Sequence, residues 1–158
     1  MTLDANGGKF KDGEQIFVIK TDGKTVAELP DAPIKEGYSF IGWYLDKEGN
    51  KSAEELLSKA ITTTVTLYAK WGYAITFNSN GGSETNSIID IGGAEISAPD
   101  EPEKTGYVFS GWFTDDGTFE DEFIFETMPQ QNITLYAKWE LYNIGLSFTL
   151  KIMTASMR

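Results

Sequence analysis

The stretch that decides the fold is Thr66-Leu67-Tyr68-Ala69-Lys70-Trp71, because the same six residues return unchanged at residues 134–139. An identical hexapeptide that occurs twice in 158 residues indicates a duplication rather than chance. Within it, alternation places Leu67, Ala69 and Trp71 on one face, which is the period of two of a half-buried strand. Each copy of the hexapeptide is therefore predicted to be a strand.

Two further sequence motifs are repeated upstream of the hexapeptides. Residues 37–44 and 106–113 both read G-Y-x-F-x-G-W followed by an aromatic residue, and they start 69 positions apart. Residues 6–8 are Asn-Gly-Gly, and residues 80–82 repeat this turn 74 positions later. The chain is thus two copies of one unit of near 70 residues, and the first copy has about five extra residues between Gly8 and Gly37.

The duplication predicts the domain organisation. We expect repeat domain 1 over residues 1–71 with a truncated N-terminal strand, repeat domain 2 over residues 72–139, and a tail over residues 140–158. The second copy opens with a full strand at residues 73–77, and the first opens midway along the equivalent stretch, which indicates a piece of a longer protein. The tail resembles the first strand of a third copy, and self-association through residues 142–150 is left open because an unpaired strand seeks a sheet edge.

Composition is that of a soluble globular chain, with 41% hydrophobic and 23% charged residues. No apolar run approaches the roughly 20 residues of a membrane span, so no membrane insertion is expected. The chain has no Cys and no His, which removes catalytic triads and dyads that use a Cys nucleophile or a His base. Without disulfides, each small core must be built from large side chains, and all four Trp lie inside the repeated blocks.

Charge is strongly negative and unevenly divided. Residues 1–71 carry nine Lys against eleven acids, and residues 72–139 carry two Lys against twelve acids, within a net charge of −11. This excess repels phosphate, so nucleic acid is not expected as a partner. The acidic run at residues 115–122 does not have the spacing of a calcium loop, and a solvated turn is the preferred interpretation. We expect no metal, no cofactor and no catalytic residues, and hence no enzyme.

Each copy is predicted to run strand, strand, extended proline segment, strand, short helix or loop, and strand, which is a small α+β domain. The most convincing helix is residues 52–60, with Ser52 as its cap and apolar side chains at Ala53, Leu56, Leu57 and Ala60. In residues 37–44, plain alternation predicts that Phe40 and Trp43 lie on opposite faces of the strand. The strand glycines, Gly42 and Gly111, are expected to mark a bulge or a close approach.

Taken in order, the words N-G-G, P-x-x-P, G-Y-x-F-x-G-W and T-L-Y-A-K-W closely resemble the Listeria–Bacteroides repeat, also called the internalin B-type repeat, over nearly all of residues 2–139. The resemblance implies an α+β chain of two tandem small β-grasp (ubiquitin-like) repeat domains, strand-rich with a short helix. It also implies a non-catalytic module that is extracellular or on the cell surface or cell wall of a bacterium.

The resemblance implies no active site, and the recurring positions are instead expected to determine the fold. They are Gly37, Tyr38, Phe40, Gly42, Trp43, Leu67, Tyr68 and Trp71, with Gly106, Tyr107, Phe109, Gly111, Trp112, Leu135, Tyr136 and Trp139. Four aromatic residues form a candidate interaction surface: Tyr44, Tyr68, Phe113 and Tyr136. A spacer or stalk with a role in adhesion or protein–protein interaction is the first interpretation, and a carbohydrate-binding module with exposed aromatic residues is the alternative. The partners left open are a host or matrix protein and a polysaccharide.

Overall fold

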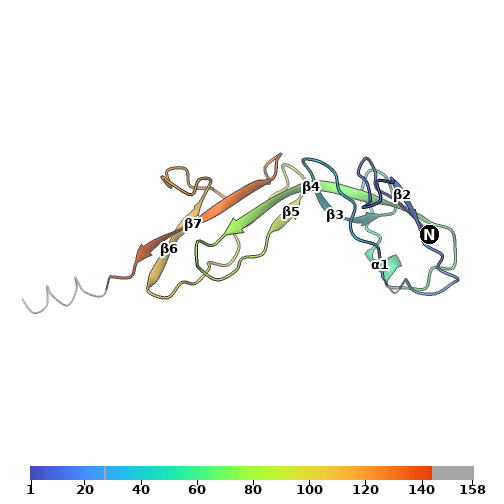
Figure 1. Cartoon of the computed structure of the whole chain (residues 1–158), viewed down its shortest axis with the longest axis horizontal. Helices are drawn as coiled ribbons and strands as arrows, with labels where there is room; N and C mark the ends of the chain where they lie inside the picture. Colours follow the sequence, from blue (N-terminus) through green and yellow to red (C-terminus); the bar gives the residue numbers. More distant parts are fainter. Residues whose placement is uncertain (27, 144–158) are drawn as a thin grey trace, which may run out of the picture. The chain divides into compact units, whose positions relative to one another are not determined.

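The computed structural model describes residues 1–26 and 28–143, and in these residues it forms a mixed sheet with one short helix (Figure 1). The elements run β1 (Thr2–Asp4), β2 (Ile16–Val18), β3 (Ser39–Tyr44), α1 (Glu54–Leu57), β4 (Thr66–Asn78), β5 (Ile88–Asp90), β6 (Tyr107–Phe113) and β7 (Ile133–Leu141). This order confirms a strand-rich α+β chain. The strand expected over residues 142–150 lies outside the described residues, apart from Tyr142 and Asn143.

The strand pairing places the start of the first copy beside its end. β1 is parallel to β4, with Leu3 opposite Leu67, and β2 is antiparallel to β1 on its other side. β3 is antiparallel to β4, with Trp43 opposite Ala69. The sheet order is β2-β1-β4-β7-β6, and β3 and β5 also pair with β4. β4 therefore has the most partners of the strands named here, since β1, β3, β5 and β7 all pair with it.

β4 contains both the first hexapeptide and the opening strand of the second copy. Its residues Leu67 and Ala69 are buried, as the alternation predicts. β3 pairs with β4 up to Gly72, and β5 pairs with β4 from Tyr73 onward. The two copies are thus connected by continuous strand, and no loop separates Trp71 from Tyr73.

Residue contacts divide the chain into two compact units whose bounds cut across the two copies. The first unit comprises Met1–Thr76, Ser87–Ser97 and Phe125–Ile133, and the second comprises Phe77–Asn86, Ala98–Ile124 and the residues from Thr134. One reason is the Asn132 side chain, whose Oδ1 accepts hydrogen bonds from Ala74 N–H at 2.8 Å and from Ser39 Oγ at 3.1 Å. The boundary between repeat domains 1 and 2, expected between residues 71 and 72, is derived from the repeated sequence and stays a prediction.

The helix predicted over residues 52–60 is shorter in the structure. Helix α1 has only four residues, Ala53 is its N-cap, and Ser52 Oγ accepts the Glu54 N–H at 3.2 Å without being the cap residue. Ala60 is not on the helix, because it forms a β-bridge with Thr25. The prediction of helix over residues 52–60 is therefore wrong at both ends, and the tertiary bridge to Thr25 is the physical reason at its C-terminal end.

β3 and β6, which contain Gly42 and Gly111, both carry the expected bulge. The pairing register shifts between Phe40 and Gly42 in β3, and between Phe109 and Trp112 in β6. A bulge inserts one residue, so Phe40 and Trp43 come to the same face, with ring centroids 5.3 Å apart. The expectation of opposite faces is wrong because plain alternation does not survive the inserted residue.

Gly111→Ala is expected to destabilise the fold more than Gly42→Ala, because the backbone conformation at Gly111 strains any residue that has a Cβ. Gly111 has φ +118°, and a Cβ there would lie 2.7 Å from Glu122 Oε1, whereas the nearest atom to a Cβ at Gly42 is Tyr44 Cε2 at 3.8 Å. Gly111→Ala should lower the free energy of unfolding by about 1–3 kcal/mol, and Gly42→Ala by less than about 1 kcal/mol. Urea unfolding of the two variants measures this, and equal losses would contradict it.

Candidate functional site

In each copy, side-chain hydrogen bonds join the turn after the first strand to the closing hexapeptide. Asn6 begins the turn with φ 46°, and its Nδ2 donates to the carbonyl of Ala69 at 3.0 Å. The indole Nε1 of Trp71 donates to the carbonyls of Ala5 at 3.0 Å and Asn6 at 3.1 Å. We call this pair of side chains the Asn–Trp staple, and it fastens the N-terminal turn to β4.

The second copy contains the same staple. Asn80, with φ 47°, donates to the carbonyl of Ala137 at 3.0 Å, and Trp139 Nε1 donates to the carbonyl of Ser79 at 2.8 Å. The last glycine of each turn, Gly8 or Gly82, lies against the indole so closely that a Cβ would overlap the ring. The repeated words N-G-G and Y-A-K-W are thus two halves of one contact, which sequence reasoning missed because it assigned the Asn only to a turn.

A repeated lysine covers the aromatic rings beside each staple. Lys35 Nζ lies 4.4 Å from the ring centroid of Tyr38 and 5.8 Å from that of Trp71. In the second copy, Lys104 Nζ lies 4.6 Å from the ring centroid of Tyr107 and 5.6 Å from that of Trp139. Such cation–π contacts contribute roughly 0.5–1 kcal/mol each at exposed sites. Residues 33–38 and 102–107 both read P-x-K-x-G-Y, so the repeat of this Lys was visible in the sequence.

The four residues of the candidate interaction surface form two cross-strand pairs, one in each copy. Tyr44 lies opposite Tyr68, and Phe113 lies opposite Tyr136. Both tyrosines of the first pair and Tyr136 are half-buried. Phe113 is only 5% exposed and packs against the ring of Phe119 at a centroid distance of 5.6 Å, so its expected place on an interaction surface is corrected.

Lysines also cover three of these rings. Lys70 Nζ lies 4.7 Å from the ring centroid of Tyr44, and Lys47 Nζ lies 5.8 Å from that of Tyr68. Lys138 Nζ lies 5.1 Å from the ring centroid of Phe113. A ring whose face is covered by an ammonium group from the same protein offers less open apolar face to a ligand.

The recurring positions differ widely in burial. Leu67 and Leu135 are fully buried, and Trp43 and Trp112 are 7% and 4% exposed. Tyr38 and Tyr107 are 42% and 40% exposed, so their rings are held at the surface by the lysines rather than in the core. Gly37 and Gly106 have φ values of 75° and 82°, a conformation that favours glycine. Their role as fold determinants stays a prediction.

The acidic run of residues 115–122 begins with a carboxylate that organises its own loop. Asp115 Oδ1 accepts hydrogen bonds from the N–H groups of Phe119 at 2.9 Å, Gly117 at 3.0 Å and Thr118 at 2.7 Å. These bonds, that from Phe119 first, lower the pKa of Asp115 to about 2. Asp46 does the same in the first copy, where the N–H of Asn50 is the main cause of a lowered pKa. Among the described residues, no group of three or more acids is arranged to hold a metal ion.

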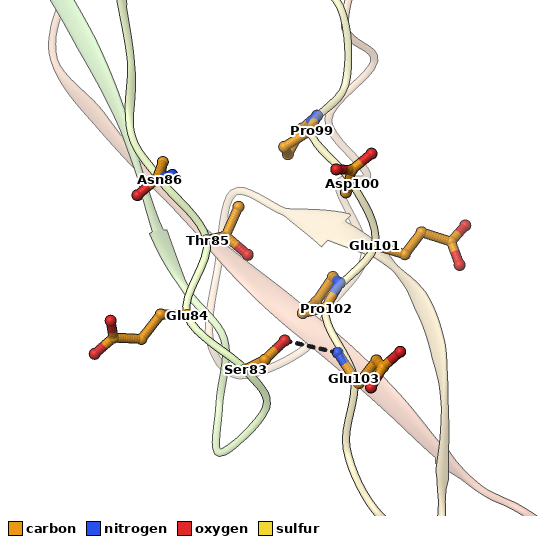
Figure 2. Close-up of a pocket in the computed structure, with 9 residues that line it drawn as sticks. All are labelled: Ser83, Glu84, Thr85, Asn86, Pro99, Asp100, Glu101, Pro102 and Glu103. Atoms are coloured by element: carbon orange, nitrogen blue, oxygen red, sulfur yellow. Dashed lines mark hydrogen bonds between the residues drawn. The ribbon is translucent and has the colours of Figure 1, made fainter.

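A groove of about 490 Å³ lies in the second compact unit between residues 83–86 and residues 99–103 (Figure 2). Ser83 Oγ accepts the Glu103 N–H at 2.9 Å and ties the two segments together. In Figure 2 the side chains of Glu84 and Glu101 point to opposite sides, away from the gap. Because these carboxylates diverge, they do not form the oxygen cage that a cation requires.

A second groove of about 650 Å³ adjoins the first and shares Ser83 with it. Its lining includes Lys104, Tyr107 and Trp139, the lysine and the two rings beside the second staple. The aromatic end of this groove therefore carries a fixed positive charge above the rings.

Among the described residues, no helix is long and apolar enough to cross a membrane.

Comparison with known proteins identifies a repeat family. The family model of the Listeria-Bacteroides repeat domain matches residues 1–70 and 73–138. A putative membrane protein of Evansella cellulosilytica is 37% identical over an alignment of 142 residues that covers 87% of this chain and 21% of that protein. A putative Gly-rich membrane protein of the same organism is 36% identical over 94% of this chain and 17% of its own length.

Internalin H of Listeria monocytogenes is 35% identical over an alignment of 132 residues that covers 81% of this chain and 24% of that protein. The chain thus spans between 17% and 24% of the length of these relatives.

The staple Asn residues are expected to stabilise the fold through their side chains. Asn6→Gly and Asn80→Gly keep the positive φ accessible but remove the bond to the hexapeptide, and each should lower the free energy of unfolding by about 1–2 kcal/mol. Asp22→Gly is a matched control, since Asp22 has φ 45° and its side chain is exposed. Urea unfolding that shows equal effects in all three variants would contradict the staple.

Asp115 predicts a pH dependence at the acid end. Its pKa falls from 3.8 to about 2 on folding, so the folded state binds the proton less tightly than the unfolded chain. The carboxylate therefore contributes stability above about pH 4, and this contribution is lost as the pH falls through about 2. The difference in urea midpoint between the wild type and Asp115→Asn should be present at pH 7 and much smaller at pH 2. Glu120→Gln, at an exposed acid in the same loop that accepts none of these hydrogen bonds, is the matched control at the same two pH values.

Proposed function

The chain belongs to the Listeria-Bacteroides repeat family, and on this premise we propose that it is a non-catalytic repeat module of a bacterial surface protein. It acts as a spacer or stalk and takes part in adhesion or protein–protein interaction, outside the cell or on the cell wall. We further propose a β-grasp fold for each repeat, which the parallel pairing of β1 with β4 supports in the first copy. The names of the relatives, internalin H and putative membrane proteins, support the location.

The observation that carries this proposal is that the residues shared by the two copies contact one another. The staple joins Asn6 to the hexapeptide, and Lys35 covers the rings of Tyr38 and Trp71. Each of these contacts recurs in the second copy. The residues that the two copies share therefore make the same internal contacts in both, whereas the charge, which a binding partner would meet, differs strongly between the copies.

Exposed apolar side chains support the adhesion part of the proposal. Tyr107 lies opposite Leu141 at the end of the β6–β7 pair, and these residues are 40% and 71% exposed. Val108 and Tyr142, beside them in sequence, are 48% and 62% exposed. Tyr107 and Leu141 are a directly opposite pair, whereas Val108 projects from the other face of β6. Exposed aromatic and aliphatic side chains that neighbour each other, as Tyr107 and Leu141 do, are typical of protein–protein contacts. A host or matrix protein is the partner that we propose for this surface.

Carbohydrate binding is the second candidate function, and the groove beside the second staple favours it. The groove contains Tyr107 and Trp139, and tryptophan and tyrosine faces can stack on sugar rings. Lys104 lies over both rings, so a sugar would have to displace its ammonium group, whose Nζ also donates to the Asn80 carbonyl at 2.7 Å. This contact places the carbohydrate interpretation behind the spacer and adhesion interpretation.

Tryptophan fluorescence with acrylamide quenching, measured with and without a panel of wall and host polysaccharides, separates the two functions. Trp43 and Trp112 are buried and Trp71 and Trp139 are half-buried, so we expect emission that is blue-shifted relative to free tryptophan and poorly quenched. No polysaccharide should change the spectrum or the quenching.

The variant Lys104→Ala extends this measurement, and Lys35→Ala is its matched control in the first copy. If a polysaccharide protects the wild-type indoles from acrylamide, and Lys104→Ala but not Lys35→Ala strengthens the protection, carbohydrate binding in the groove replaces the spacer and adhesion proposal.

A further inference from the structure

We infer that β1 and β4 of the first copy form a mechanical clamp, so that the module bears tension along its chain. This inference rests on the proposed spacer function and adds that the spacer resists tension along the chain. The two strands are parallel neighbours, with Thr2 opposite Thr66, Leu3 opposite Leu67 and Asp4 opposite Tyr68. They are the first and the last strand of the copy, and hence the strands through which tension enters and leaves it.

The parallel arrangement decides how the load acts on the hydrogen bonds. Tension along the chain pulls β1 by its N-terminal end and β4 by its C-terminal end. Because the strands point the same way, these two pulls are opposite, and the strands must slide along each other before they separate. The evenly spaced bonds of a parallel pair are then loaded together, in shear, rather than opened one at a time from an end.

The staple extends the clamp beyond the three strand pairs. The Asn6 side chain bonds to the Ala69 carbonyl, and the Trp71 indole bonds to the carbonyls of Ala5 and Asn6. At the other end of β1, Thr2 N–H donates to the Val65 carbonyl at 2.8 Å. Cross-links between the same two segments therefore run from Thr2 to Asn6, and sliding must break them with the strand bonds.

Burial protects the clamp from water. Leu3 and Leu67, at its centre, are both fully buried, and Ala5 and Ala69 are 0% and 1% exposed. Water that reaches a strained backbone bond can replace it, so a covered ladder holds under load longer than an exposed one. Forced unfolding is governed by the unfolding rate, and the covered bonds raise the barrier that sets this rate.

Force measurement in two pulling directions tests the clamp on the full chain. The sequence has no cysteine, so one introduced Cys gives a single attachment point in addition to a handle at the N-terminus. Thr64, before β4, and Asn78, the last residue of β4, are both exposed. One protein carries Thr64→Cys with Asn78→Ser, and the other carries Thr64→Ser with Asn78→Cys, so the two are matched in the positions changed.

Attachment at residue 78 loads β1 and β4 in shear, whereas attachment at residue 64 pulls apart the adjacent starts of the two strands and opens their bonds in sequence. At the same pulling speed, we expect the unfolding force through residue 78 to be several times that through residue 64. Asn6→Gly should lower the force through residue 78 and leave the force through residue 64 nearly unchanged. Urea unfolding of the two proteins should give the same midpoint, which shows that direction and not stability sets the difference.

Equal forces in the two directions would overturn the clamp. That result would leave the spacer proposal standing, since the force comparison involves no partner. Conversely, protection of the indoles by a polysaccharide would overturn the spacer proposal without changing the directional difference, so the two failures are distinguishable.

Discussion

The hydrogen bonds from the closing tryptophan and the turn asparagine are the constraint on which the rest of each copy depends. The indole N–H of Trp71 is held by carbonyls of the turn that follows β1, and the amide of Asn6 is held by the carbonyl of Ala69. A small chain without disulfides needs another means of holding its ends together, and these side chains supply it. They hold β1 and β4 side by side as parallel neighbours. Leu3 on β1 and Leu67 on β4 are both buried in the core.

The lysines explain how large aromatic side chains can recur at the surface of such a module. Tyr38 and Tyr107 remain about two-fifths exposed, yet each ring carries an ammonium group at 4.4 Å or 4.6 Å from its centroid. The aliphatic stem of a lysine covers apolar surface while its charge stays in water. The same contact stabilises the position of the ring and leaves less of its face open to a neutral ligand. Both effects agree with a structural use of these rings.

The passage from one copy to the next is also built into the sheet. β4 continues through Gly72, whose backbone approaches the Asp90 carbonyl so closely that any side chain would overlap it. Tyr73 stacks on Tyr38 with ring centroids 5.4 Å apart, and Asn132 bonds to Ser39 and Ala74. These contacts explain why segments of the second copy belong to the first compact unit.

The sequence by itself determined the duplication, the strands of the repeated words, the bulges at Gly42 and Gly111, and the burial of Leu67 and Leu135. These features follow from local pattern, because alternation and glycine act over a few neighbouring residues. Only the tertiary structure decided the short helix, the shared face of Phe40 and Trp43, the burial of Phe113, and the staple. Each of these depends on a partner far away in the chain: Thr25 ends the helical region, and Asn6 reaches Ala69 across 63 residues. Local periodicity carries no information about which distant carbonyl will receive a side-chain donor, and that is settled only when the first and last strands lie side by side.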